Sequence, residues 1–255
     1  MLKRLFCKIG LVILMLLPGF SFLIADTGTN INFQEIFPKH YASAMTYLQG
    51  VEEEISSIVA YRGGDVKVLL PVVFPELIRY FLVQDIIEIT GLKIFYVHLG
   101  DTERKFANFS IGRFQMKPRF VEELEQSVRE LGLTAEFDDI ISYPEGSDGK
   151  DIRRIRISRL ADSDWQALYL ACFGVIVDHL FGQISWGTTE EKIAFYATAY
   201  NHGFNEGEEE IKKWIDVKLF PHGIEYGRPQ YSYAEVATFF YHTYWEQALE
   251  ESTAK

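Results

Sequence analysis

The stretch "VKVLLPVVFPELIRYFL", residues 66–82, decides the fold because it is the most apolar segment beyond the first 25 residues. Apolar residues in this pattern predict a helix. Leu69, Val73 and Glu76 follow one another at helical spacing, which places the carboxyl group of Glu76 on an apolar side. Burial disfavours the ionised form of a carboxyl group and raises its pKa, so Glu76 is a candidate general acid.

Two prolines, Pro71 and Pro75, precede Glu76 within this stretch. Proline lacks a backbone N–H and disturbs a helix interior, so we expect backbone groups near Glu76 to be freed to face a cleft. The alternative is that Glu76 is a solvated residue at a distorted helix end.

The chain beyond residue 25 shows almost no alternation of period two, which predicts an all-α, mostly helical domain over residues 26–255. We expect helices over 32–60, closed by a turn at Tyr61–Gly64, over 84–98, and from Pro118 onward. Capping boxes indicate three later helices and pair Ser163 with Gln166, Thr188 with Glu191, and Ser232 with Glu235.

Two segments depart from this pattern. Residues 137–157 carry turn signals and a short β-like alternation of isoleucines, which predicts an excursion from the helical body, either a small β-hairpin or a lip of the cleft. The mixed charges of this segment indicate a solvated face. Residues after Gly207 open with acidic side chains and are expected to form a C-terminal helical extension. We expect its aromatic residues to lie in the core, with a role as sugar-binding platforms as the alternative; they are Trp214, Tyr231, Tyr233 and Trp245.

The N-terminus has the three-part layout of a secretory signal peptide. A basic start leads into the apolar run "IGLVILMLLPGFSFLIA", which ends at Ala25 and predicts cleavage after that residue. Leu23 is larger than the residue usual at its position, which leaves an uncleaved anchor open. The helix-breaking pair Pro18 and Gly19 favours cleavage.

Export and charge together argue against nucleic-acid binding and for a location in the cell envelope. The net charge of −11 becomes −14 when cleavage removes the three basic residues Lys3, Arg4 and Lys8. A strongly acidic protein is a poor candidate for nucleic-acid binding, which depends on neutralising phosphates. Cleavage also leaves one of the two cysteines, Cys172, so no disulfide can form within the mature chain. We therefore expect a periplasmic or cell-envelope location, where peptidoglycan is the obvious polymer.

The common hydrolytic motifs are missing from the sequence. The six histidines are scattered without the spacing of a metal site, and neither a G-x-S-x-G elbow nor a phosphate-binding loop is present. Cys172 lies in an apolar stretch typical of a buried, inert thiol. The sequence therefore predicts neither a metal nor a cofactor, and it leaves carboxylates as the candidates for catalysis.

Two later motifs place amides where helices begin or end. In "SIGRFQMKP", residues 110–118, Gln115 stands between large apolar side chains at a turn, with Gly112 before it. In "YATAYNHGF", residues 196–204, Tyr200 and Asn201 end a helix and can offer hydrogen-bond donors and acceptors to a ligand amide. A satisfied buried glutamine and an ordinary helix C-cap are the alternatives.

Taken in order, "LLPVVFPELIRY", "SIGRFQMKP" and "ATAYNHGF" resemble the lysozyme-like lytic transglycosylase family over roughly residues 66–204. The resemblance implies a lysozyme-like helical fold that acts on peptidoglycan, with Glu76 as the sole catalytic acid and base. It implies that Gln115 and Asn201 contact N-acetyl sugars, that Tyr200 positions Glu76 or the substrate, and that Gly112 lets the backbone approach a sugar. On this basis the residues assigned to substrate binding are Ser110, Gly112, Gln115, Met116, Tyr200 and Asn201.

The sequence departs from that family in two respects. Leu77 follows the candidate acid where the family commonly has serine. The spacing from Glu76 to Gln115 is 39 residues (115 − 76), longer than the roughly twenty typical of the family, so residues 80–108 would be an insertion. Glu88 shortens the spacing to 27 (115 − 88) and is the competing candidate, although the apolar helix before Glu76 matches the family better.

The function predicted from the sequence is a lytic transglycosylase, a glycosidase-like lyase that cleaves the β-1,4 bond between N-acetylmuramic acid and N-acetylglucosamine. Peptidoglycan glycan strands are the predicted partner, and protein partners in the envelope stay open. The alternatives are a wall-binding or scaffold protein without turnover, and a hydrolytic lysozyme.

Overall fold

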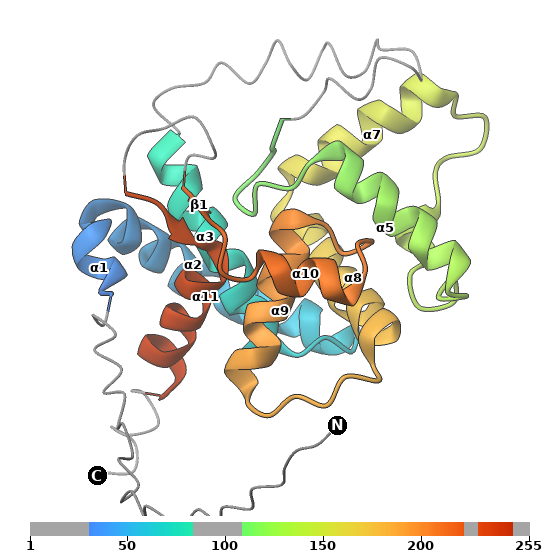
Figure 1. Ribbon diagram of the computed structural model, residues 1–255. Helices are drawn as coiled ribbons and strands as arrows, with labels where there is room; N and C mark the ends of the chain where they lie inside the picture. The colour runs from blue at the N-terminus through green and yellow to red at the C-terminus, as the bar shows by residue number, and fades with distance from the viewer. Residues whose placement is uncertain (1–30, 84–108, 222–228, 247–255) are drawn as a thin grey trace, which may run out of the picture. The chain divides into compact units, whose positions relative to one another are not determined.

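The computed structural model describes residues 31–83, 109–221 and 229–246, which are drawn in colour in Figure 1. The predicted signal peptide, the predicted helix over 84–98 and the competing acid Glu88 lie outside these ranges. Within them, the chain from Asn32 onward clusters as one unit.

Helices dominate this unit, so the prediction of a mostly α-helical fold is confirmed. The strands β1 (Lys218–Phe220) and β2 (Tyr231–Ser232) form one antiparallel pair, in which Lys218 faces Ser232 and Phe220 faces Tyr231. The helices are α1 (Phe33–Ile36), α2 (Pro38–Tyr61), α3 (Val66–Val83), α5 (Pro118–Glu130), α6 (Asp138–Ile141), α7 (Gly149–Ala161), α8 (Ser163–Phe181), α9 (Thr189–His202), α10 (Glu208–Trp214) and α11 (Tyr233–Tyr241), followed by the π-helical turn η2 (His242–Glu246).

Helix α3, drawn in teal in Figure 1, is the centre of the core. It packs against α2, α9 and α11, and the rings of Phe74 and Phe240 stack at 3.9 Å between α3 and α11. The helix continues through both internal prolines, Pro71 and Pro75. Each proline lacks the N–H that a helix interior normally uses, so the backbone ladder of α3 has fewer bonds close to Glu76.

The predicted hairpin over residues 137–157 is wrong, because α6 and α7 occupy this segment. Asp148 starts α7: its carboxylate accepts hydrogen bonds from the backbone N–H groups of Lys150 and Asp151 at 2.7 and 2.9 Å, and Asp151 completes a capping box. These caps satisfy the free donors of a helix start and outweigh a weak isoleucine alternation.

The predicted solvated face of the same segment is only partly present. Arg154 is exposed, but the Arg156 side chain is 12% exposed and lies against α5. Its guanidinium donates to Glu125 Oε2 at 2.6 Å and to Glu122 Oε1 at 2.8 Å, and the Tyr143 hydroxyl donates to Glu125 as well. Because Glu125 is buried, this ion-paired network joins α7 to α5.

Two of the three predicted capping pairs start a helix at the predicted residue. Ser232 and Glu235 form the complete box at α11. Thr188 caps α9, although the Glu191 carboxylate accepts from Gly187 N instead of from Thr188 N. The start of α8 is capped by Asp162 in place of Ser163, because the Asp162 carboxylate accepts from the N–H groups of the second and third residues of the helix.

The cap of α11 yields a stability prediction. The fully buried Ser232 hydroxyl accepts from Glu235 N and also donates to the carbonyl of Ile215, so Ser232→Ala removes two interactions. We expect a loss of about 1–2 kcal/mol in the free energy of unfolding, measured by urea denaturation. Thr188→Ala, at the exposed cap of α9, is the control and should lose less. An equal or larger loss in the control would contradict this ranking.

Candidate functional site

Glu76 lies in the second half of α3 and is 4% exposed. Its Oε1 accepts a hydrogen bond from Arg79 Nη1 at 2.6 Å, one helical turn later. Its Oε2 is buried and has no hydrogen-bond partner among the described residues. The hydroxyl of Tyr233, which is close enough to affect the carboxyl group, donates instead to the carbonyl of Val72 at 2.9 Å.

Burial controls the protonation of this group. Loss of hydration raises the pKa of Glu76, and the positive charges of Arg79 and Lys117 oppose that shift without cancelling it. Burial and the nearby Glu76 charge also raise the pKa values of Tyr200 and Tyr233 well above the ordinary phenol range. Glu76 is therefore a shielded carboxyl group beside phenols that keep their protons.

The turn that carries Gln115 is closed by a β-bridge between Ile111 and Met116, with Ile111 N donating to Met116 O at 2.8 Å. The side chains of Phe114 and Met116 are buried, as predicted for the anchors of this turn. Gln115 has a φ of 49°, and its Nε2 donates to Gly112 O at 2.8 Å. Within the described part of the chain, its Oε1 receives no hydrogen bond, so that acceptor is available to a ligand.

Gly112 has a packing role toward the protein interior, and the predicted approach of its backbone to a sugar stays a prediction. Its φ is 74°, and a Cβ there would lie 2.4 Å from the Nε2 of Gln166. Gln166 is buried in α8, and its Oε1 accepts from Phe114 N at 2.8 Å. The absence of a side chain at Gly112 thus lets Gln166 reach and fix the turn.

Arg113 connects the same turn to α2 and α3. Its guanidinium lies 4.8, 4.3 and 5.0 Å from the ring centroids of Tyr47, Tyr80 and Phe81. Its buried Nη1 has no hydrogen-bond partner in the described ranges, so the faces of these rings are its surroundings. Arg113 shows no local sequence signal for this role, because the rings lie more than thirty positions away along the chain.

Tyr200, near the end of α9, also holds the turn. Its hydroxyl donates to Phe114 O at 2.8 Å. It therefore positions the segment that carries Gln115, and its predicted role toward Glu76 or the substrate stays a prediction.

A small pocket of about 70 Å³ brings the three predicted motifs together. Of the residues proposed from the sequence, Gly112 is the one that does not line it. Arg79, Lys117 and Phe120 line it in addition, next to Glu76, Ser110, Gln115, Met116, Tyr200 and Asn201.

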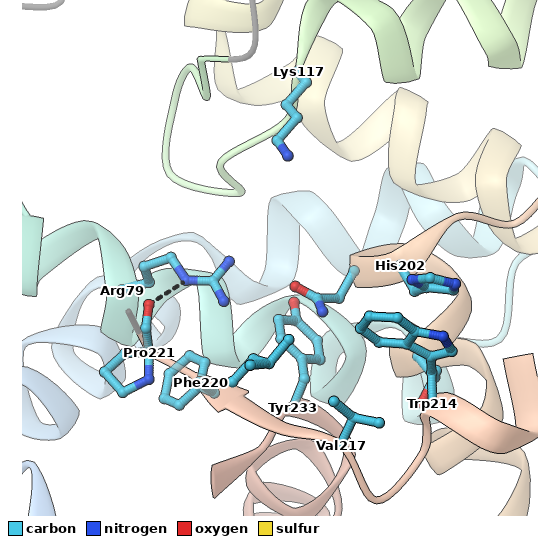
Figure 2. A pocket seen from close by; sticks show the side chains of 11 residues that line it. Arg79, Lys117, His202, Trp214, Val217, Phe220, Pro221 and Tyr233 are labelled. Carbon is cyan, nitrogen blue, oxygen red and sulfur yellow. Dashed lines mark hydrogen bonds between the residues drawn. The ribbon is translucent and has the colours of Figure 1, made fainter. Parts of the chain in front are cut away.

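A larger cavity of about 460 Å³, whose lining is drawn in Figure 2, shares Arg79, Lys117 and Asn201 with this pocket. The two spaces therefore adjoin. Much of its wall comes from the C-terminal part of the chain. Trp214 stacks on His202 with 4.0 Å between ring centroids, and Arg79 Nε donates to Pro221 O at 3.2 Å, the dashed line in Figure 2. From the sequence, Trp214 and Tyr233 were expected in the core, with sugar binding as the alternative, and both line this cavity.

The part of the chain that the structure describes offers no metal site or membrane span. The described ranges contain no cluster of three or more metal-ligating side chains, and none of their helices is both long and apolar enough to cross a bilayer. Cys172 is a free, buried thiol, as predicted, and burial raises its pKa. No protein-family model, curated protein or solved structure matches the chain. The lysozyme-like resemblance therefore stays a prediction.

The packing of Gly112 can be tested against Gly132, which has nearly the same φ of 72° but open space around its Cα. Gly132→Ala should destabilise the protein by about 1–2 kcal/mol, the strain of a left-handed alanine. Gly112→Ala adds a clash with Gln166 and should cost about 1–3 kcal/mol more. Thermal or urea unfolding of both variants measures the difference. Equal losses would show that Gln166 moves aside freely.

The burial of Glu76 predicts a pH-dependent stability. Because its folded pKa lies above its unfolded pKa, the native state resists ionisation, and stability falls as pH rises through that interval. Glu76→Gln removes the ionisation and keeps the shape. We expect the variant to be more stable than the wild type at pH 7, with the difference shrinking in acid, as measured by urea unfolding across pH. A variant less stable at pH 7 would mean that the ion pair with Arg79 outweighs burial.

Proposed function

We propose that the chain is an exported lytic transglycosylase of cell-wall peptidoglycan, with Glu76 as its single acid and base. The observation that carries the proposal is the buried carboxyl group of Glu76, whose Oε2 has no partner among the described residues, in one pocket with Gln115 and Asn201. An unpartnered oxygen on a shielded carboxyl group can hold a proton and deliver it to a bound ligand.

The reaction would proceed in two proton transfers. Protonated Glu76 gives its proton to the oxygen that links muramoyl C1 to the next sugar, and the C1–O bond breaks as an oxocarbenium-like state forms. The Glu76 carboxylate then takes the proton of the muramoyl C6 hydroxyl while that oxygen bonds to C1. The products are a 1,6-anhydro sugar and a shortened strand, no water is consumed, and Glu76 ends protonated again.

A single carboxyl group is consistent with the surroundings of Glu76. The residues that line the two adjoining spaces include no other aspartate or glutamate within the described ranges. A two-carboxylate glycosidase needs its second acid within about 5–10 Å of the first. The lining therefore favours an internal hydroxyl over an activated water as the nucleophile.

The volumes indicate where the saccharide would bind. A space of about 70 Å³ holds only one or two waters, whereas about 460 Å³ lies in the range of small-ligand sites. We place the sugar rings in the larger cavity, with the bond to be broken at the boundary beside Glu76. Gln115 Oε1 and the exposed Asn201 amide are then available to an N-acetyl group.

The activity test asks whether oxygen from water enters the products. Purified peptidoglycan is digested in water enriched in ¹⁸O, and the products are identified by mass spectrometry. We expect anhydro-muropeptides without ¹⁸O, and at least about a hundredfold lower rate in Glu76→Gln, the loss expected for a missing general acid. Incorporation of ¹⁸O at a reducing end would indicate a hydrolytic lysozyme instead. Undiminished activity in Glu76→Gln would remove Glu76 from the mechanism.

One observation favours a second function, a wall-binding protein without turnover. The hydrogen bond from Arg79 to Glu76 stabilises the ionised carboxylate, which cannot act as an acid. Binding of wall sacculi without release of soluble fragments, in the wild type and in Glu76→Gln alike, would support this alternative.

A further inference from the structure

We infer that the larger cavity is a subsite for a carboxylate carried by the glycan strand, held between Arg79 and Lys117. The inference rests on the proposed function, because it takes a peptidoglycan strand to be the ligand. It adds a property that the motif resemblance does not provide, namely discrimination between acidic and neutral amino sugars.

The charge of the cavity differs from that of the chain. The chain has a net charge of −11, yet Arg79 and Lys117 both line the cavity, and its described lining contains no acidic residue. Figure 2 shows Lys117 extending toward the cavity from the side opposite Phe220 and Tyr233. A concave site lined by one sign of charge attracts ligands of the other sign.

Arg79 and Lys117 both have N–H donors that no described residue uses. Arg79 donates from Nε to Pro221 O and from Nη1 to Glu76 Oε1, and within the described residues its Nη2 makes no hydrogen bond. The ammonium group of Lys117 forms no hydrogen bond or ion pair with any described residue, and the one bond of this residue runs from Val121 N to its backbone carbonyl at 3.3 Å. A carboxylate that enters the cavity could therefore accept from both, and charge-assisted bonds of this kind are stronger than neutral ones.

The proposed strand offers such a carboxylate on every second sugar. The lactyl group of a muramoyl unit ends in a free carboxylate when no peptide is attached, and an attached peptide brings carboxylates of its own. An oligomer of N-acetylglucosamine has the same sugar backbone and acetamido groups but no charge. The anion thus has two sources, which separate ligands can distinguish.

Occupation of the subsite would also act on Glu76. An anion that pairs with Arg79 competes with Glu76 for the same guanidinium and weakens the hydrogen bond that favours the ionised form of Glu76. Binding of an acidic strand would in this way favour the protonated form of Glu76, which the first proton transfer needs. This coupling resolves the conflict between the observed ion pair and the role of Glu76 as an acid.

The test measures binding, so that it does not depend on turnover. The full chain carrying Glu76→Gln is titrated calorimetrically with a neutral N-acetylglucosamine oligomer, a peptide-free muramoyl strand and a peptide-bearing strand of equal length. We expect Lys117→Met, added to this chain, to weaken binding of at least one acidic strand about 10–100-fold and to leave binding of the neutral oligomer unchanged. Lys150→Met, at an exposed position on α7, is the matched control and should change neither.

The pattern of losses identifies the source of the anion. Loss with both acidic strands assigns the subsite to the lactyl carboxylate, and loss with the peptide-bearing strand alone assigns it to the stem peptide. Equal effects on neutral and acidic ligands, no effect, or no binding of any ligand would overturn the inference. If Lys117→Met fails to fold, as judged by circular dichroism, the salt dependence decides, since added salt should weaken only the acidic ligands.

The two proposals can fail separately. Absence of anhydro products together with a Lys117-dependent preference for acidic strands would remove the enzyme and keep the subsite. Anhydro products formed without such a preference would keep the enzyme and remove the subsite.

Discussion

The candidate site depends on a carboxyl group that is held out of water beside a guanidinium. Glu76 is 4% exposed, and of its two oxygens one is bonded to Arg79 and the other is unpartnered within the described chain. Burial favours the neutral acid and Arg79 favours the carboxylate. A ligand that enters the adjoining cavity and changes either influence would change the balance between the neutral and the ionised form of Glu76.

The rest of the site holds the Gln115 turn against this acid. Helix α8 fixes the turn through Gln166, α9 through the Tyr200 hydroxyl, and α2 and α3 through the aromatic rings around Arg113. These attachments differ in chemistry: an amide, a phenol and a cation. A turn fixed from several sides presents its amide with little freedom, and binding a ligand then orders little that is not already ordered.

Local patterns predicted the parts of the site that depend on spacing along one helix or turn. The position of Glu76 on an apolar side followed from Leu69 and Val73, and Arg79 was open to the same reasoning, since basic residues three positions after an acid often pair with it. Asp148 and Asp151 likewise show a capping pattern in the sequence that the prediction of a hairpin overlooked. By contrast, Gln166 meets Phe114 across 52 positions, and residues so distant share no local pattern.

The wall formed by the C-terminal part of the chain sets the boundary of the functional module. Arg79 donates a hydrogen bond to the carbonyl of Pro221. The Tyr233 hydroxyl donates to the carbonyl of Val72 in α3, between the two prolines of that helix. Tyr41 of α2 is hydrogen-bonded to Thr243, which links the first long helix to the last turn. A fragment trimmed to the motif-bearing residues 66–204 would therefore lose Pro221 and Tyr233 and open the acid to bulk water on that side.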